Sequence, residues 1–312
     1  FKLMSDYKYS IEAKNVNKIF YKKSKEINAL INFDIKIKKG SIHGLLGPNG
    51  AGKSTFINIL GGLVKKNTGN VNICGVDIDK NSKLSKFKIG IVPQELNIDP
   101  FFSPAELLEL QAGLYGIPKN KRKTDEILEN LKLTDQRNAY ARTLSGGMRR
   151  RLLIAKALVH SPEMLILDEP TAGVDVEIRA SVWSYIRKIN DLGTTICLTT
   201  HYLEEAENLC DTISIINLGK KIKEDTKNNL LNIISKKTVS FEINHEFFIP
   251  EDLKKFNPKQ DELKLTLQYD KNKTKLKSII NILNKHNIDF SEINTSESDL
   301  EDVFLKLIKN HD

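Results

Sequence analysis

Alternating polar and apolar positions mark the first part of the chain. Residues 11–16 and 31–37 follow this pattern, which predicts a pair of antiparallel strands. The next apolar run, residues 41–46, is short and predicts a buried strand that ends in a glycine-rich segment. Apolar residues then recur at helical spacing over residues 53–64. This segment is expected to form a helix whose apolar face contains Phe56, Ile57, Leu60 and Leu63.

Helical spacing dominates a later region, from about residue 100 to residue 160, where we expect a helical insert. Short apolar runs and helical segments alternate on either side of it. The expected strands are residues 89–92, 164–168, 194–200 and 212–217, and the expected helices are residues 176–190 and 202–209. Strands separated by helices predict a mainly parallel sheet that is covered on both faces.

The pattern changes again near residue 235, where glycine becomes rarer. Alternation predicts strands at residues 239–243, 263–267 and 290–293, and helical spacing predicts helices at residues 276–286 and 300–308. We therefore expect two domains, a large α/β domain over residues 1–235 and a small C-terminal α+β domain over residues 236–312.

Composition narrows the class of protein. The 312 residues are 40% hydrophobic and 28% charged, which is typical of a folded chain. The net charge of +8 comes mostly from lysines without an aromatic-interleaved basic stripe, so we expect solvated surfaces and no nucleic-acid partner. No apolar run is long enough for a membrane span, and no signal peptide is recognised, which predicts a cytoplasmic protein. Cys74, Cys197 and Cys210 lack metal-ligand spacing and are expected to be buried thiols.

A phosphate-binding pattern follows the buried strand at residues 41–46. Residues 47–54 match G-x-x-x-x-G-K-[ST] and lie between a predicted strand and a predicted helix. Their backbone N–H groups and the start of the helix are expected to hold the phosphates of ATP. Lys53 is expected to reach the β- and γ-phosphates, and Ser54 to bind Mg²⁺. The residues of this loop are Gly47, Pro48, Asn49, Gly50, Ala51, Gly52, Lys53 and Ser54.

Polar side chains also follow three predicted strands of the parallel sheet. Asp168 and Glu169 end the strand at 164–168, at the sheet edge where α/β folds bind ligands. Asp168 suits a Mg²⁺ shell, and Glu169 suits polarisation of an attacking water. His201 follows the strand at 194–200 and is expected to contact the γ-phosphate. Gln94 follows the strand at 89–92 and can meet the metal and the water with its amide.

A second glycine-containing motif lies far downstream of the first. It consists of Leu144, Ser145, Gly146, Gly147 and Met148. A hydroxyl followed by two closely approachable backbone N–H groups suits another phosphate-contacting surface. Two such surfaces so far apart in one sequence suggest a site that is split between two copies. Arg149, Arg150 and Arg151 directly follow, in a chain whose eight arginines all lie between residues 122 and 187, which indicates a structural or mechanistic role.

The order of these motifs resembles the nucleotide-binding subunit of ABC transporters over about residues 11–225. The resemblance rests on residues 47–54, Gln94, residues 144–148, 165–169 and 172–175, and His201. The resemblance implies the P-loop NTPase fold of ABC ATPases, with an N-terminal antiparallel β subdomain and with ATP and Mg²⁺ as cofactors. It also implies a dimer that sandwiches two ATP molecules. Ser145 and Gly147 of one subunit would contact the γ-phosphate held by the other.

The resemblance implies roles for further residues. Asp175 would link the two ATP sites across the dimer interface. Thr55 would join the phosphate loop in binding ATP, and Phe20, or alternatively Tyr21, would stack on adenine, although Phe20 also suits a core position. Two positions depart from the common family pattern: residue 148 is Met where many members have Gln, and residue 172 is Ala where many have Ser.

The subfamily is indicated by residues 148–151, 199–207 and 300–305, which look most like ABC-2-type exporter ATPases. Such a subunit is expected to act as a homodimer or heterodimer on the cytoplasmic face of the inner or plasma membrane, bound to a separate ABC-2-type permease. Pro100, Phe101 and Phe102 are either an apolar socket for that permease or core residues. The competing hypotheses are a soluble ABC ATPase that acts on nucleic acid or ribosomes, and a module that uses ATP only to dimerise.

Overall fold

Two compact units make up the chain. The structure is a computed structural model that describes residues 7–22, 25–172, 176–233, 236–271, 273–297 and 300–309. Contacts between Cα atoms divide the chain into residues 1–227 and 228–312. The sequence prediction places this division slightly later, after residue 235.

An antiparallel sheet opens the first unit. Its strands are β1 (Tyr9–Lys22), β2 (Lys25–Lys38), β4 (Thr68–Ile73) and β5 (Val76–Asp77), in the order β2-β1-β4-β5. The long β1–β2 ladder pairs Ile11 with Ile37 and Val16 with Phe33, so apolar residues of both strands share one face. The predicted antiparallel pair is confirmed, and both strands are longer than the alternation in the sequence suggested.

A six-stranded sheet forms the centre of the same unit, in the order β10-β9-β3-β8-β7-β6. Its strands are β3 (Ile42–Leu46), β6 (Ile89–Val92), β7 (Met164–Asp168), β8 (Thr195–Thr200), β9 (Thr212–Asn217) and β10 (Lys220–Thr226). Every neighbouring pair except β9·β10 is parallel. The predicted mainly parallel sheet is thus confirmed, and its parallel strands end at one common edge.

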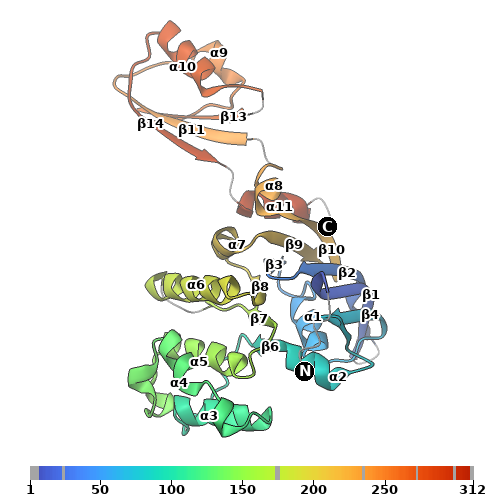
Figure 1. The fold of residues 1–312 in the computed structure, drawn as a ribbon. Coiled ribbons are helices and arrows are strands. Elements are labelled where there is room, and N and C mark those ends of the chain that lie inside the picture. The colour runs from blue at the N-terminus through green and yellow to red at the C-terminus, as the bar shows by residue number, and fades with distance from the viewer. Residues whose placement is uncertain are drawn as a thin grey trace. The chain divides into compact units, whose positions relative to one another are not determined.

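The helices of this unit fall into two groups. Those that alternate with the strands are α1 (Lys53–Leu60), α2 (Ser82–Lys88), α6 (Val176–Asp191) and α7 (Leu203–Leu209). The helical insert contains α3 (Pro104–Leu114), α4 (Thr124–Asn130) and α5 (Gly146–Leu158), which contact one another and form the green group in Figure 1. Ser103 begins α3 with a capping box, in which the Glu106 carboxylate accepts from the Ser103 backbone N–H over 2.8 Å.

The predicted end of the helix after the phosphate loop was wrong. The helix was expected to reach Val64 with Leu63 on its apolar face, but α1 ends at Leu60. Gly61 and Gly62 follow, and Gly62 has a φ of 70°, a left-handed conformation that stops a helix. Leu63 is consequently 81% exposed and takes no part in the core.

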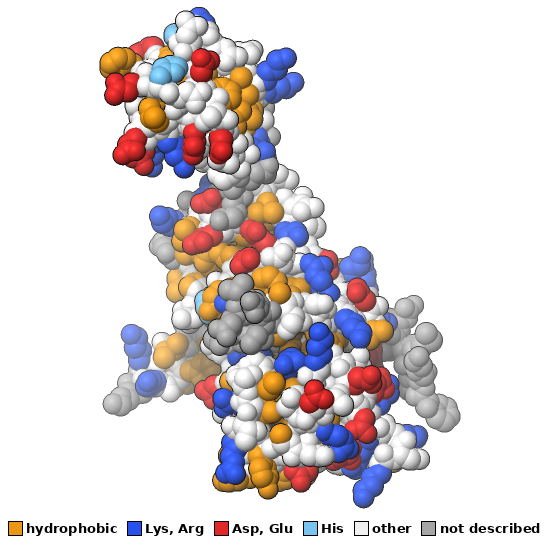
Figure 2. Space-filling view, turned by 90° about the vertical axis from the view of Figure 1, so that its left-hand side faces the viewer, with side chains coloured by type: hydrophobic (Ala, Val, Ile, Leu, Met, Phe, Trp, Pro, Cys, Tyr) orange, Lys and Arg blue, Asp and Glu red, His pale blue; other side chains and the backbone are white. Residues whose placement is uncertain are grey.

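Surface charge of both signs is mixed on the face of the molecule that Figure 2 shows. Figure 2 shows Lys and Arg side chains scattered among Asp and Glu side chains on the face in view, as the sequence predicted. Among the described residues, no helix has the length and apolar character needed to cross a membrane. All three cysteines are buried free thiols, as expected.

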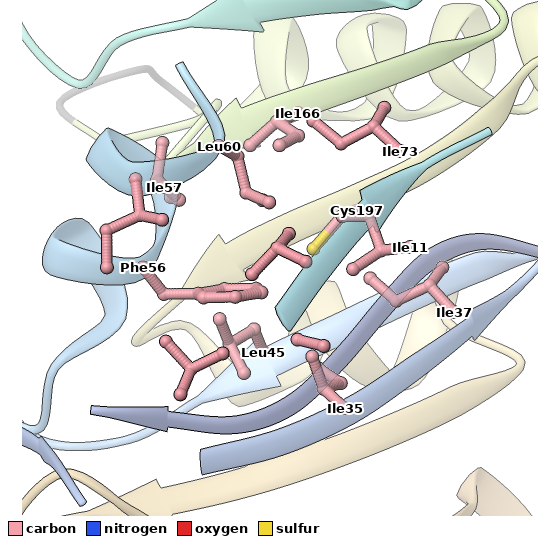
Figure 3. Close-up of a cluster of buried hydrophobic side chains, with 14 of the residues drawn as sticks. Ile11, Ile35, Ile37, Leu45, Phe56, Ile57, Leu60, Ile73, Ile166 and Cys197 are labelled. Carbon is pink, nitrogen blue, oxygen red and sulfur yellow. The ribbon is translucent and has the colours of Figure 1, made fainter. Parts of the chain in front are cut away.

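The main core of the first unit lies where α1 meets residues from both sheets. Figure 3 shows Phe56, Ile57 and Leu60 of α1 among side chains of the two sheets. The Phe56 ring packs 5.0 Å from the ring of Phe33 on β2, at an interplanar angle of 58°. Burying this apolar face fixes the position of α1 and hence of the loop that precedes it.

The second unit is a small α+β domain. After α8 (Lys227–Leu231) come β11 (Lys236–Ile243), α9 (Glu251–Lys254), β12 (Lys259–Asp261), β13 (Lys264–Asp270), α10 (Leu276–Lys285), β14 (Phe290–Glu297) and α11 (Leu300–Lys309). The sheet order β12-β13-β11-β14 with antiparallel neighbours is a split β-α-β arrangement. Leu253 of α9 and Ile279 and Leu283 of α10 pack on its apolar face. The predicted α+β character of this region agrees with these elements.

Candidate active site

The loop between β3 and α1 has a shape that only glycine permits at two positions. A Cβ atom at Gly47 would lie 2.3 Å from the backbone oxygen of Ile216. Gly52, the N-cap of α1, has a φ of 110°, and a Cβ atom there would lie 2.6 Å from the backbone oxygen of Ala29. The glycines therefore let the loop pack against β2 and β9 in a tight turn of the kind whose N–H groups can face an anion.

Lys53 is buried at the start of α1 and folds back over this loop. Its Nζ donates to the backbone oxygens of Gly47, at 2.6 Å, and Pro48, at 3.1 Å. Burial lowers the pKa of Lys53, and the nearby charges of Glu169 and Asp168 oppose that shift. Among the described residues, the hydrogen bonds of this buried ammonium go to backbone oxygens, so a phosphate could become its charged hydrogen-bond partner.

The end of β7 holds the two carboxylates in fixed positions. Glu169 has a left-handed backbone with a φ of 49°, and its N–H donates to the backbone oxygen of Thr199 over 3.0 Å. The hydroxyl of Thr199 donates to the carboxylate of Asp168. Burial raises the pKa of Asp168, because its negative charge is partly removed from water. A divalent cation beside Asp168 would relieve this unfavourable burial.

Both carboxylate oxygens of Glu169 are contacted by side chains from neighbouring strand ends, Gln94 after β6 and His201 after β8. Gln94 Nε2 donates to Glu169 Oε2 over 2.8 Å, and His201 Nδ1 lies 3.0 Å from Glu169 Oε1. The Glu169 side chain is 7% exposed and that of His201 is 51% exposed. A nearly buried carboxylate with both oxygens engaged is held in one orientation, as a group that must align a water molecule requires.

A cavity of about 410 Å³ lies over the phosphate loop. This volume is in the range of small-molecule sites. Its lining includes Phe20, Gln94, Asp168, Glu169 and the loop residues from Asn49 to Thr55. Phe20 is 37% exposed and lies at the cavity, so the core alternative for Phe20 was wrong. Tyr21, which is 70% exposed, is not among the lining residues.

The three residues predicted from the sequence to bind Mg²⁺ lie around the same cavity. Ser54, Gln94 and Asp168 all line this cavity, from α1 and the ends of β6 and β7. Mg²⁺ is usually held by one or two carboxylates together with the phosphates of a nucleotide and water. A single carboxylate beside a phosphate loop matches that donor set.

The second glycine-containing motif lies apart from this cavity. Ser145 is the N-cap of α5, where its Oγ accepts from the N–H of Met148 over 3.3 Å. Ser145 and Gly146 are exposed, Gly147 and Leu144 are buried, and none of these residues lines the cavity. Asp175 lies outside the described residues. Within one chain the structure thus brings together the predicted residues from four strand ends and leaves residues 144–148 elsewhere.

The sequence did not predict the contact that joins α5, which carries the second glycine-containing motif, to the loop of Gln94. Arg150 of α5 is 2% exposed, and its guanidinium donates to the backbone oxygens of Pro93, at 2.8 Å, and Gln94, at 2.9 Å. The clustering of arginines after residue 148 was the available signal, but it did not identify the acceptors. Thr199 was also missed, because its two contacts join neighbouring strands.

Comparison with known sequences identifies relatives whose alignments cover nearly the whole chain. A profile described as ABC transporter matches residues 30–172. The linearmycin resistance ATP-binding protein of Bacillus subtilis (strain 168) is 36% identical over 308 residues, which cover 95% of this chain and 97% of that protein. A daunorubicin resistance ATP-binding protein of Streptomyces coeruleorubidus is 32% identical and covers 96% of this chain and 95% of its own length. A Nod factor export ATP-binding protein of Cupriavidus pinatubonensis is 40% identical over 203 residues, 64% of this chain and 62% of that protein.

Solved structures give the same result for the fold. An ATP-binding cassette in a dimeric post-hydrolysis state with ADP and Pi matches with a TM-score of 0.62 and 28% identity, over 69% of this chain and 98% of that one. A Clostridium perfringens protein that is part of an ABC transporter complex matches with a TM-score of 0.65 and 27% identity, over 72% and 92%. The chain belongs to the ABC transporter family, as an ATP-binding subunit. It has the ABC-ATPase fold and is an ATPase.

Proposed function

We propose that this chain is the ATP-hydrolysing subunit of an ABC-2-type exporter and powers a separate membrane permease. The observation that supports it most is the placement of Glu169 between Gln94 and His201, next to the buried Lys53. Relatives that align with nearly the full chain have names that refer to antibiotic resistance, and another relative is named for export. These names favour an exporter over a soluble ATPase that acts on nucleic acid or ribosomes.

Each residue at the sheet edge has a distinct role in the proposed reaction. Lys53 and the loop N–H groups hold the β- and γ-phosphates of ATP, and Ser54, Gln94 and Asp168 hold Mg²⁺, which neutralises phosphate charge. Glu169 orients and polarises the attacking water. His201 contacts both Glu169 and the γ-phosphate. Phe20 lines the cavity and supplies the aromatic surface for adenine.

The complete site requires a second copy. Ser145 and Gly146 are exposed at the start of α5 and are not part of their own chain's cavity. The N-terminus of α5 and the Ser145 hydroxyl suit a phosphate held by another subunit. A related cassette is described as dimeric in a state with ADP and Pi, which supports this arrangement. ATP binding would close the dimer, and hydrolysis would reopen it.

An apolar surface near the Gln94 loop is the proposed docking site for the permease. Phe101 is 66% exposed, Phe102 is 36% exposed and Tyr140 is 52% exposed, so the core alternative for the two phenylalanines was wrong. The Arg142 guanidinium lies over the rings of Phe101, at 5.7 Å, and Tyr140, at 5.2 Å. Such a surface suits an amphipathic helix on the cytoplasmic side of the permease. The subunit would then be peripheral on the cytoplasmic face of the membrane.

Co-expression with an ABC-2-type permease encoded beside this chain's gene tests this function. The complex should purify intact from detergent, and its ATPase activity should rise on reconstitution into vesicles. Phe101→Ser should break the complex while the isolated subunit keeps its ATPase activity, and Leu192→Ser, at another exposed apolar position, should leave the complex intact. Absence of any complex with the permease would contradict the export proposal.

A further inference from the structure

A buried glutamate contacts the turn that follows Glu169, and none of the roles above involves it. Glu205 belongs to α7 and is 0% exposed. Its Oε1 accepts from the hydroxyl of Thr171 over 2.9 Å and from the indole Nε1 of Trp183 over 3.0 Å. Its Oε2 is buried and has no hydrogen-bond partner among the described residues. The carboxylate therefore joins three separate segments of the chain.

Two of these segments carry residues of the proposed hydrolytic site. Thr171 belongs to the turn that begins at Glu169, where the Ala172 N–H donates to the backbone oxygen of Glu169 over 3.2 Å. On the other side, α7 starts directly after the loop that carries His201. In that loop, the Tyr202 N–H donates to Thr200 Oγ1 over 2.9 Å. Glu205 thus connects the turn of Glu169 with the loop of His201.

The surroundings of Glu205 disfavour a buried carboxylate. Burial raises the pKa of Glu205, and the nearby Thr200 hydroxyl, the hydrogen bonds from Trp183 and Thr171 and the charge of Arg179 oppose the shift. The Arg179 guanidinium lies 4.6 Å from the centre of the Tyr202 ring, which in turn lies 4.2 Å from the His201 ring. An apolar side chain of similar volume would fill this space without the unfavourable burial of an oxygen that lacks a partner.

We propose that Glu205 is a positioning residue for ATP hydrolysis, which fixes the turn after Glu169 relative to the loop of His201. The physical reason is geometric: hydrolysis needs the Glu169–His201 contact of 3.0 Å, and these two residues follow different strands. A shift of about 1 Å between catalytic groups is enough to slow a reaction by about two orders of magnitude. The inference rests on the proposed roles of Glu169 and His201.

The test compares two replacements of Glu205 in the full chain. Glu205→Ala removes both hydrogen bonds and should lower kcat about tenfold, with KM for ATP within about twofold of wild type. Glu205→Gln keeps an oxygen for Thr171 and Trp183 and should recover most of kcat. Glu204→Gln changes the exposed neighbour and serves as the control. Because Trp183 is the only tryptophan, its emission should shift in Glu205→Ala and report loss of this contact.

A double substitution separates positioning from general stability. If Glu205 acts through His201, adding Glu205→Ala to His201→Ala should lower kcat by less than about twofold further. Full additivity of the two losses, or wild-type kcat in Glu205→Ala, would overturn the proposal. If Glu205→Ala does not fold, Thr171→Val and Trp183→Phe each remove one hydrogen-bond donor to Glu205, and each should lower kcat. Wild-type kcat in both of these variants would overturn the proposal. His201→Ala with undiminished kcat would instead contradict the proposed function.

Discussion

The guanidinium of Arg150 is anchored to the backbone of Gln94, with Arg150 Nη2 donating to the Gln94 oxygen over 2.9 Å. Gln94 in turn donates from its side chain to Glu169. Arg150 lies on α5, whose N-cap is Ser145. In the proposed dimer, this helix would present a surface to the ATP of a second copy while it holds a loop of its own ATP site. This contact couples the position of Gln94 to that of α5.

Arg150→Lys should weaken this coupling. A lysine has one ammonium in place of the planar fork and cannot reproduce both bonds to Pro93 and Gln94. We expect kcat to fall about tenfold while ATP binding is retained, because the phosphate loop is untouched. Steady-state ATPase assays and nucleotide titration measure the two quantities. Arg137→Lys, in an exposed ion pair with Asp125 on the same helical insert, is the control and should change neither.

Lys53→Ala should abolish ATP hydrolysis and greatly weaken ATP binding. The ammonium is held at the phosphate loop by two backbone oxygens and has no substitute among the residues that line the cavity. Binding of a fluorescent ATP analogue and phosphate release are the measurements, with the exposed Lys65→Ala as the control. Undiminished hydrolysis in Lys53→Ala would remove Lys53 from the mechanism.

Asp168→Asn should stabilise the nucleotide-free protein while impairing its activity. Folding raises the pKa of Asp168, so its contribution to stability is present at low pH and is lost as pH rises through the folded pKa. At neutral pH the amide removes a buried charge, and Tm should rise by roughly 2 °C or more. The gain should shrink as the pH approaches 3–4, near the ordinary aspartate pKa of about 3.9. Thermal unfolding across pH tests the gain in stability, and Mg²⁺-dependent ATPase assays test the loss of activity. Equal Tm values for wild type and Asp168→Asn at pH 7 would contradict the predicted gain in stability.

His43 should make the fold sensitive to acid. Burial lowers its pKa to about 4. Ser214 donates its hydroxyl proton to Glu224, so His43 Nε2 must carry a proton and donate to Ser214 over 2.9 Å. Because the pKa of His43 is lowered, the ring at neutral pH is the neutral form with its proton on Nε2. As pH falls from about 6.5 to about 4, the unfolded chain takes up a proton that the folded chain excludes, and stability is lost.

His43→Gln tests this expectation because its amide can still donate to Ser214 but does not titrate. The variant should lose less stability than wild type between pH 6.5 and pH 4 in urea unfolding, while His245→Gln, at an exposed position, should follow the wild-type curve. Parallel curves for wild type and His43→Gln would show that His43 is not the titrating group.

Local patterns in the sequence were sufficient for the framework of the first unit. The alternating strands, the strand–loop–helix around Lys53 and the carboxylates after an apolar strand each depend on neighbours in sequence. From the common edge of parallel strands it followed that Gln94, Asp168 and Glu169 would converge, and the structure places these three around one cavity. Strands β4, β5, β10 and β12 were missed. For β5 and β12 the reason is length, because two or three residues carry no periodicity.

Contacts between distant segments were beyond the reach of periodicity. Arg150 and the backbone of Gln94 are far apart in sequence, and so are Glu205 and Thr171, so only the fold reveals that they meet. The exposure of Phe101 and Phe102 was equally undetermined, since an aromatic pair after a turn suits a core as well as a surface. The end of α1 was misplaced because the helical spacing continued across two glycines that break the helix.

The most direct test of the account is Glu169→Gln. Gln keeps an oxygen and a similar shape beside Gln94 and His201 but loses the charge that polarises water. We predict that this variant binds ATP with Mg²⁺ normally, hydrolyses it at least about a hundredfold more slowly, and elutes as a closed dimer that retains ATP. Turnover near the wild-type rate, or a monomer under saturating ATP and Mg²⁺, would contradict the account.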